Sequence, residues 1–81
     1  MNGPTYTTTA NFADLNTVLV RMDDPVFNRP WYLKGVRNGQ YSWTRNALFA
    51  KDFRPATAAK HVKALKAGAD TAWNTYRETW M

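Results

Sequence analysis

The chain has no cysteine, one histidine and only six acidic residues among its 81 positions. Without cysteine no disulfide can form, and His61 alone supplies too few ligands for a zinc site. We therefore expect neither a metal nor any other cofactor. The lack of cysteine also fits a reducing compartment, so we expect a cytoplasmic protein.

Long apolar runs are missing as well. The longest is Val18-Leu19-Val20, far short of the roughly 20 apolar residues that a membrane-spanning helix needs. The N-terminus has neither a basic start nor an apolar stretch, so we predict no secretory signal and no membrane contact. Because the chain begins with Met and its length suits one domain, we expect a complete gene product with a single domain, residues 1–81.

The residues for familiar catalytic sites are also scarce. The four glycines are scattered, so no phosphate-binding loop is predicted. A hydrolytic triad would have to use Ser42 and His61, but Ser42 is predicted in mid-strand and not on a sharp nucleophile turn. Asp23 and Asp24 precede a proline and fit a turn better than a carboxylate pair. We predict a protein that is not an enzyme and has no catalytic residues.

Aromatic rings and positive charge are what the chain has in abundance. It contains four Trp, four Tyr and four Phe, and each large ring can bury roughly 150–250 Å², enough to give a small protein an adequate core. Eleven basic residues against six acidic ones leave a formal charge of +5. Such an excess attracts polyanions and acidic proteins alike, so it does not choose between them.

The clearest structural signal is Asn38-Gly39, which lies between two aromatic runs in residues 31–44. Both central residues of a type I′ turn need positive φ, so Asn-Gly here predicts a β-hairpin with a two-residue loop. Strict alternation along its strands then assigns the side chains to two faces. One face receives Tyr32, Lys34, Val36, Tyr41 and Trp43, and the other receives Trp31, Leu33, Gly35, Arg37, Gln40, Ser42 and Thr44.

The segments before and after this hairpin are less regular. Residues 1–10 fit either an edge strand or a loose terminus, because they are rich in threonine. Residues 11–22 are predicted to form a helix that Asn11 caps, with a strand through residues 17–21 as the alternative, since valine and threonine are frequent there. Residues 46–53 are predicted to form a short third strand or a tight connection.

A long amphipathic helix is predicted from about Thr57 to Trp80, because apolar residues recur there every three or four positions. Gly68 marks either a kink or the end of one helix, after which Asp70 caps a second. The expected fold is α+β: a small antiparallel sheet packs on the long C-terminal helix. The sheet contains the hairpin at about residues 31–44 and a possible third strand, and a short N-terminal helix completes the fold.

Residues 31–65 resemble a ββα pattern found in many small phage and mobile-element accessory proteins. After the hairpin come Ala50-Lys51-Asp52-Phe53 and then a helix that opens with Thr57-Ala58-Ala59. Proteins of this kind include host-takeover factors and inhibitors of bacterial defence, anti-CRISPR proteins among them. The resemblance implies a phage- or mobile-element-encoded protein in the host cytoplasm that binds a host protein and modulates or inhibits it.

The predicted partner-binding residues lie at the C-terminal end of the long helix: Trp73, Tyr76, Arg77 and Trp80. This helix would span roughly 35 Å, whereas a six-residue strand spans only about 20 Å, so its end would extend past the sheet. That end has three possible fates: burial within the monomer, pairing in a homodimer, or docking on a foreign protein. Trp, Tyr and Arg are enriched at interface hot spots, which favours a host-protein partner as the first hypothesis.

Nucleic-acid binding is the alternative partner hypothesis. Base stacking would use Tyr32, Tyr41 and Trp43, and phosphate contacts would use Lys34, Arg37, Lys60, Lys63 and Lys66. The same aromatic residues also suit a core beneath the helix, and the same lysines suit a solvated helix face. A structural or dimerising protein without a separate ligand is the third hypothesis.

Overall fold

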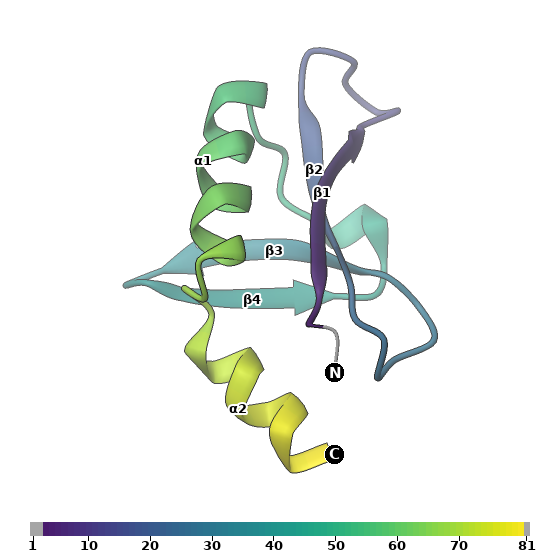
Figure 1. The fold of residues 1–81 in the computed structure, drawn as a ribbon. Coiled ribbons are helices and arrows are strands. Elements are labelled where there is room, and N and C mark those ends of the chain that lie inside the picture. The colour runs from purple at the N-terminus through teal and green to yellow at the C-terminus, as the bar shows by residue number, and fades with distance from the viewer. Residues whose placement is uncertain (1–2, 81) are drawn as a thin grey trace.

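The computed structural model describes residues 3–80, apart from the side chain of Trp80, and its elements are four strands, a short 3₁₀ turn and two α-helices. The strands form one antiparallel sheet in the order β1-β2-β3-β4, and the helices follow them in the chain (Figure 1). The predicted α+β class is therefore confirmed. The elements are β1 (Thr5–Ala10), β2 (Val18–Asp23), β3 (Trp31–Arg37), β4 (Gln40–Thr44), η1 (Ala47–Phe49), α1 (Pro55–Lys66) and α2 (Thr71–Trp80).

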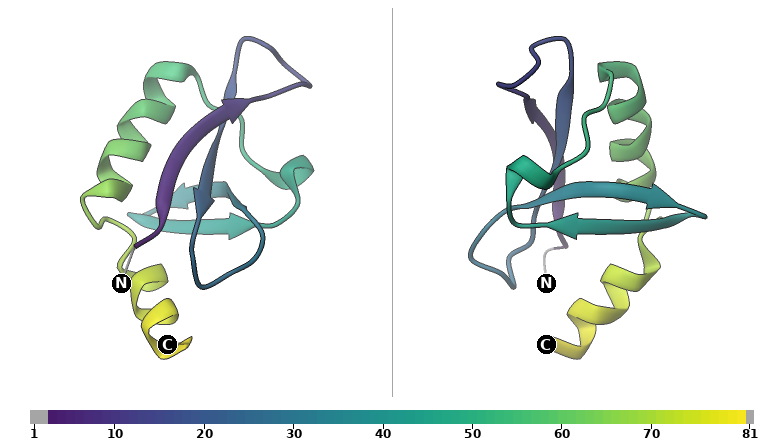
Figure 2. Two further views of the ribbon diagram at one scale, coloured as in Figure 1. Left: turned by 45° about the vertical axis from the view of Figure 1, so that its right-hand side comes forward. Right: turned by 180° about the vertical axis from the view of Figure 1, so that it is seen from behind.

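The sheet consists of two hairpins that cross steeply: in Figure 1 β1 and β2 stand upright, and β3 and β4 lie across them. β2 and β3 pair at only two positions, so the two strands diverge beyond these. The segment after η1 closes this gap, as the view from behind in Figure 2 shows. Phe53 and Val18 exchange backbone hydrogen bonds of 3.0 and 2.8 Å, and the Lys51 amide donates to the Leu33 carbonyl at 3.0 Å.

The helix predicted over residues 11–22 is wrong. Residues 11–17 form turns, and the rest of the segment is β2, so the strand alternative through residues 17–21 was nearer the structure. A period of two indicates the strand: Val20 and Met22 are completely buried on the side facing the helices. Asn11 does cap a structure, but a turn: its side-chain oxygen accepts a hydrogen bond from the Ala13 amide at 3.1 Å.

Of the two descriptions left open for the N-terminal residues, the edge strand is the one observed. β1 pairs with β2 over its full length, from Thr5 opposite Asp23 to Ala10 opposite Val18, with no shift in register. Of the two alternatives for residues 46–53, a short third strand and a tight connection, the tight connection is the one observed. It holds the η1 turn and an isolated bridge at Phe53.

The hairpin and its turn are confirmed, with Asn38 at a φ of 52° and Gly39 at 76°. The predicted faces are confirmed for Val36, Tyr41 and Trp43, which share the core side. They are wrong for Tyr32 and Leu33, because the register shifts within β3. Leu33 lies opposite Trp43 and Gly35 lies opposite Ser42, so Lys34 is the extra residue of a β-bulge. Because the predicted register is counted outward from the turn, the inserted residue puts the side chains that precede it in β3 on the opposite face from the predicted one.

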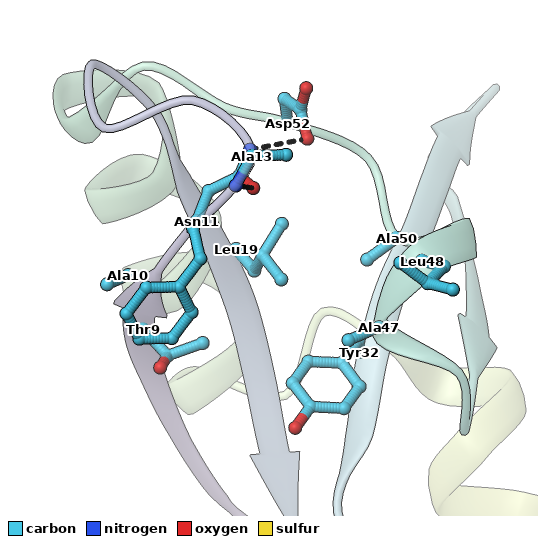
Figure 3. Close-up of a pocket in the computed structure, with 11 residues that line it drawn as sticks. Thr9, Ala10, Asn11, Ala13, Leu19, Tyr32, Ala47, Leu48, Ala50 and Asp52 are labelled. Atoms are coloured by element: carbon cyan, nitrogen blue, oxygen red, sulfur yellow. Dashed lines mark hydrogen bonds between the residues drawn. The ribbon is translucent and has the colours of Figure 1, made fainter.

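The bulge explains which hairpin side chains reach the core. Val36, Tyr41 and Trp43 pack against it together with Leu33, which is completely buried. Tyr32, grouped with Tyr41 and Trp43 by strict alternation, lies instead on the opposite face beside Leu19 (Figure 3).

The predicted long helix is two helices. α1 ends at Lys66, and Gly68 adopts a φ of +91° in the turn that follows. The Asp70 carboxylate accepts a hydrogen bond from the Trp73 amide at 3.0 Å and so caps α2. The alternative of a helix end at Gly68 with Asp70 as a cap is thus the one observed.

One hydrophobic core joins the sheet to both helices. Its buried side chains come from β1, β2 and β3, from the segment before α1, and from α1 and α2. Each fully buried large aliphatic side chain contributes about 1.5–3 kcal/mol. The core residues are Tyr6, Val20, Met22, Leu33, Phe53, Ala58, Leu65 and Trp73.

Candidate interaction surface

Two loop segments hold large apolar side chains out in solvent. Phe12 and Leu15, in the turns after β1, are 89% and 81% exposed, and Leu48 and Phe49, in η1, are 88% and 65% exposed. Single exposed apolar residues are common on protein surfaces, but a group of them marks an interaction site. We refer to these four residues as the apolar rim.

Phe12 and Leu48 of the apolar rim border a pocket of about 460 Å³, a size typical of ligand sites. The pocket lies between the 11–17 turns and η1, and Figure 3 shows Leu19 and Tyr32 between its two walls. Phe12 and Leu48, from opposite walls, contribute directly to its lining. The remaining lining residues are Thr9, Ala10, Asn11, Ala13, Ala47, Ala50 and Asp52.

A buried asparagine fixes the two walls relative to each other. The Asn11 side chain, only 6% exposed, donates to the Asp52 carboxylate and to the Thr17 hydroxyl, both at 2.8 Å. The first of these bonds is drawn in Figure 3 and joins the turns after β1 to the segment after η1. With Asn11 anchored inward, the adjacent Phe12 is held outward, so the pocket and its rim are preformed.

The pocket offers mainly apolar contacts and a few polar groups. Its lining is mostly aliphatic, and its only carboxylate, Asp52, already accepts a hydrogen bond from Asn11. Within residues 3–80 no three metal-ligating side chains gather at one place. None of the helices described is long and apolar enough to cross a membrane. Because its lining is mostly aliphatic, the pocket can take up an apolar side chain and orient it through a few polar groups.

The structure folds the predicted partner-binding residues back onto the sheet. Trp73 is 8% exposed and packs against Trp31 and Phe27, with ring centroids 5.2 and 5.3 Å apart. Tyr76 is 44% exposed and stacks on Phe27 at 6.1 Å. Arg77 forms an ion pair with Asp24, in which the Arg77 Nε lies 2.6 Å from a carboxylate oxygen. The fourth predicted residue, Trp80, has its side chain outside the described part of the chain.

The acid that draws these residues together is Asp24, whose side chain is completely buried. Its carboxylate accepts hydrogen bonds from Arg77 at 2.6 and 3.2 Å, from the Trp73 indole at 3.0 Å and from the Val26 amide at 3.0 Å. Burial alone would raise the pKa of Asp24, but these donors and the positive charge outweigh it and lower that pKa. The carboxylate therefore stays ionised and attaches α2 to the sheet.

A second ionisable group in this region is Tyr6. Its burial, together with the negative charges of Asp70 and Asp24, raises the pKa of Tyr6 to about 12, against the opposing effect of Arg77. The neutral phenol is thus part of the core.

The residues predicted for nucleic-acid stacking do not share one surface. Tyr41 contacts the ring of His61 edge-on at 6.1 Å, under α1, and the Trp43 indole donates to Asp70 at 2.6 Å. Tyr32 lines the pocket on the other face. The predicted phosphate contacts are all exposed, and two of them, Lys63 and Lys66, line a groove between β1 and α1: the set is Lys34, Arg37, Lys60, Lys63 and Lys66.

Sequence reasoning missed the whole apolar rim. Phe12 and Leu15 lie in the segment predicted to be a helix, and the Leu48-Phe49 pair lies in the segment predicted to be a short strand or a tight connection. The available signal was the adjacent apolar pair in a short segment between Asn46 and Lys51, too short for an ordinary helix.

Comparison of the chain with protein-family models, curated proteins and solved structures returned no match. The case for function therefore depends on these residues.

Proposed function

We propose that the protein is a non-enzymatic binding module that recognises another protein by taking an apolar side chain of it into the pocket beneath the apolar rim. The observation that carries the proposal is the apolar rim itself. Phe12 and Leu48 remain exposed on opposite sides of a preformed pocket that they line, and Leu15 and Phe49 are exposed in the same two loop segments. Each would gain roughly 1.5–3 kcal/mol on burial, which folding leaves unused.

The resemblance of residues 31–65 to small phage and mobile-element proteins extends this proposal. The bound protein would belong to the host, and binding would modulate or inhibit it in the host cytoplasm. The excess of basic residues, +5 in total, would favour a partner whose surface is acidic around the inserted side chain.

Peptide selection tests the proposal without knowledge of the host. A random peptide library is selected against the full chain, and each selected peptide is titrated against variants by fluorescence anisotropy. We expect peptides with a large apolar residue whose affinity falls at least about tenfold in Phe12→Ser/Leu48→Ser, because a filled pocket is worth more than 1.4 kcal/mol. The variant should remain folded, since both side chains are almost fully exposed.

The matched control is Tyr76→Ser, which removes an exposed aromatic ring of the C-terminal helix. Selected peptides should bind it as they bind the unaltered chain. Peptides that lose affinity only for Tyr76→Ser would move the site to the C-terminal helix. Selection of no peptide above background would contradict the proposal.

Nucleic-acid binding is a second candidate, favoured by the exposed lysines of α1 and the charge of +5. A salt titration with labelled single- and double-stranded DNA and RNA tests it. Steep salt dependence that flattens when Lys60, Lys63 and Lys66 are replaced would support it, because each released counterion adds to the slope. Sedimentation of the free chain as a stable dimer would instead favour the third hypothesis, a dimerising protein.

A further inference from the structure

β1 is an edge strand, and nothing in its own sequence protects that edge. It contains no proline, no charged residue and no bulge, which are the usual devices that prevent an edge from pairing with another chain. Its six residues pair in unbroken register with β2 on one side. On the other side, alternate main-chain N–H and C=O groups face outward, a template for one more strand.

A groove of about 590 Å³ runs along this edge, beside α1. Its lining comes from β1 and α1, with no residue of β2, so it lies at the open side of β1: the residues are Tyr6, Thr7, Thr8, Ala59, Val62, Lys63 and Lys66. In Figure 1 and in the left panel of Figure 2, α1 lies beside β1. A groove between an edge strand and a helix suits an extended peptide, whose backbone pairs with the strand while its side chains contact the helix.

The charge of the groove selects among possible occupants. Lys63 and Lys66 are exposed, and no acidic residue lines the groove. A second copy of this chain would bring two rows of α1 lysines together about a twofold axis, and each copy already carries a charge of +5. The only aromatic ring in the lining, Tyr6, is 4% exposed and so offers no face for a stacked base.

We propose that an extended, acidic segment of another polypeptide adds to the free edge of β1 as a fifth strand, with its carboxylates against Lys63 and Lys66. This site is separate from the pocket beneath the apolar rim and goes beyond the function proposed above. Main-chain pairing with β1 supplies affinity, and the two lysines supply the preference for acidic side chains.

The test uses a short fluorescein-labelled peptide of alternating glutamate and valine, blocked at both ends, so that all carboxylates project from one side of the added strand. Binding to the full chain is measured by anisotropy at low salt. We expect Lys63→Glu/Lys66→Glu to weaken it about tenfold, because attraction becomes repulsion at two positions. The control Lys34→Glu/Lys60→Glu has the same net charge but changes lysines outside the groove lining, and it should bind nearly normally.

Two further variants separate strand addition from simple charge attraction. Proline is introduced at Thr7 and, separately, at Thr8; the fold tolerates it only where the replaced N–H points outward. That folded variant should lose binding although both lysines remain. Leu48→Ser should bind unchanged, so failure here is distinguishable from failure of the pocket.

Four results would overturn the proposal. The first is that Lys34→Glu/Lys60→Glu loses as much peptide affinity as Lys63→Glu/Lys66→Glu, and the second is that the folded proline variant binds the acidic peptide as well as the unaltered chain. The third is that the acidic peptide does not bind at all. The fourth is that the chain forms a concentration-dependent dimer that the proline variant abolishes. A lysine–valine peptide that binds Lys63→Glu/Lys66→Glu better than the unaltered chain would support it, since the charge preference would then have been reversed.

Discussion

The buried ion pair between Asp24 and Arg77 allows a sharp test of how α2 is attached to the sheet. Asp24→Asn keeps the size of the side chain and one oxygen for the Val26 amide. It removes the negative charge beside Arg77, and it presents an amide donor where the carboxylate accepted hydrogen bonds from Arg77 and Trp73. The substitution therefore leaves donors facing donors in a site whose carboxylate is completely buried.

The expected cost follows from burial. Removing one partner of a buried ion pair costs about 3–5 kcal/mol, and Arg77, 12% exposed, can turn partly toward water, so we expect about 3 kcal/mol. That is a large share of the roughly 4–12 kcal/mol that a chain of this length has in total. The adjacent acid provides the control: Asp23 pairs with Arg21 on the surface, where the side chains are 45% and 38% exposed, so Asp23→Asn should cost less than about 1 kcal/mol.

The free energy of unfolding is measured by urea denaturation, followed by tryptophan fluorescence, from neutral to acidic pH. Because the pKa of Asp24 is lowered in the folded state, its contribution is complete above the ordinary carboxyl range and is lost as the pH falls through the folded pKa. The gap between the unaltered chain and Asp24→Asn should therefore narrow in acid. Equal costs for the two asparagine variants at neutral pH would refute the reasoning.

Two other predictions concern the core and the helix break. Between pH 10 and about 12 the unaltered chain should lose stability, because the Tyr6 phenol ionises in the unfolded chain before it does in the folded one. Tyr6→Phe has no phenol and should not show this loss. A shift of this size corresponds to about 2–3 kcal/mol, and parallel alkaline unfolding curves for the two proteins would contradict it. Gly68→Ala should cost about 1–2 kcal/mol, because the φ of +91° is unfavourable for a residue with a Cβ. Gly35→Ala is its control: the new Cβ would meet only the Ser42 hydroxyl at an ordinary 3.7 Å, so urea denaturation should show little change, and equal costs would be inconsistent with backbone strain at Gly68.

Local signals in the sequence predicted the turn at Asn38-Gly39 and gave, as one of two alternatives, the helix end at Gly68 with the cap at Asp70. Each of these depends on a residue type with a conformational or capping preference. The segment 11–22 was mispredicted because apolar residues there satisfy both periods at once. Val18, Val20 and Met22 alternate as in a strand, whereas Phe12 and Leu15 extend the pattern into a helical stripe. The segment forms a strand because it pairs with β1, and the sequence of the segment itself does not show this pairing.

The candidate site was harder to predict than the fold. The pocket depends on the hydrogen bond between Asn11 and Asp52, 41 positions apart, and on the divergence of β2 from β3. The hairpin faces depended on the bulge at Lys34, for which the local signal is the adjacent Gly35, since an isolated glycine inside a strand often marks a bulge. Contacts of this range become visible only once the chain is folded.

The C-terminal residues show why residue type alone is a weak guide to an interface. Trp and Arg are enriched at hot spots because they combine apolar area with strong hydrogen-bond donors, and those same properties suit a buried internal anchor. Here Asp24, 49 and 53 positions away in the sequence, accepts hydrogen bonds from Trp73 and Arg77. The apolar rim differs, because Phe12 and Leu48 are almost fully exposed and their burial would contribute little to folding. Apolar area that folding leaves exposed around a preformed pocket is available for binding, which is why the rim is the stronger candidate for the interface.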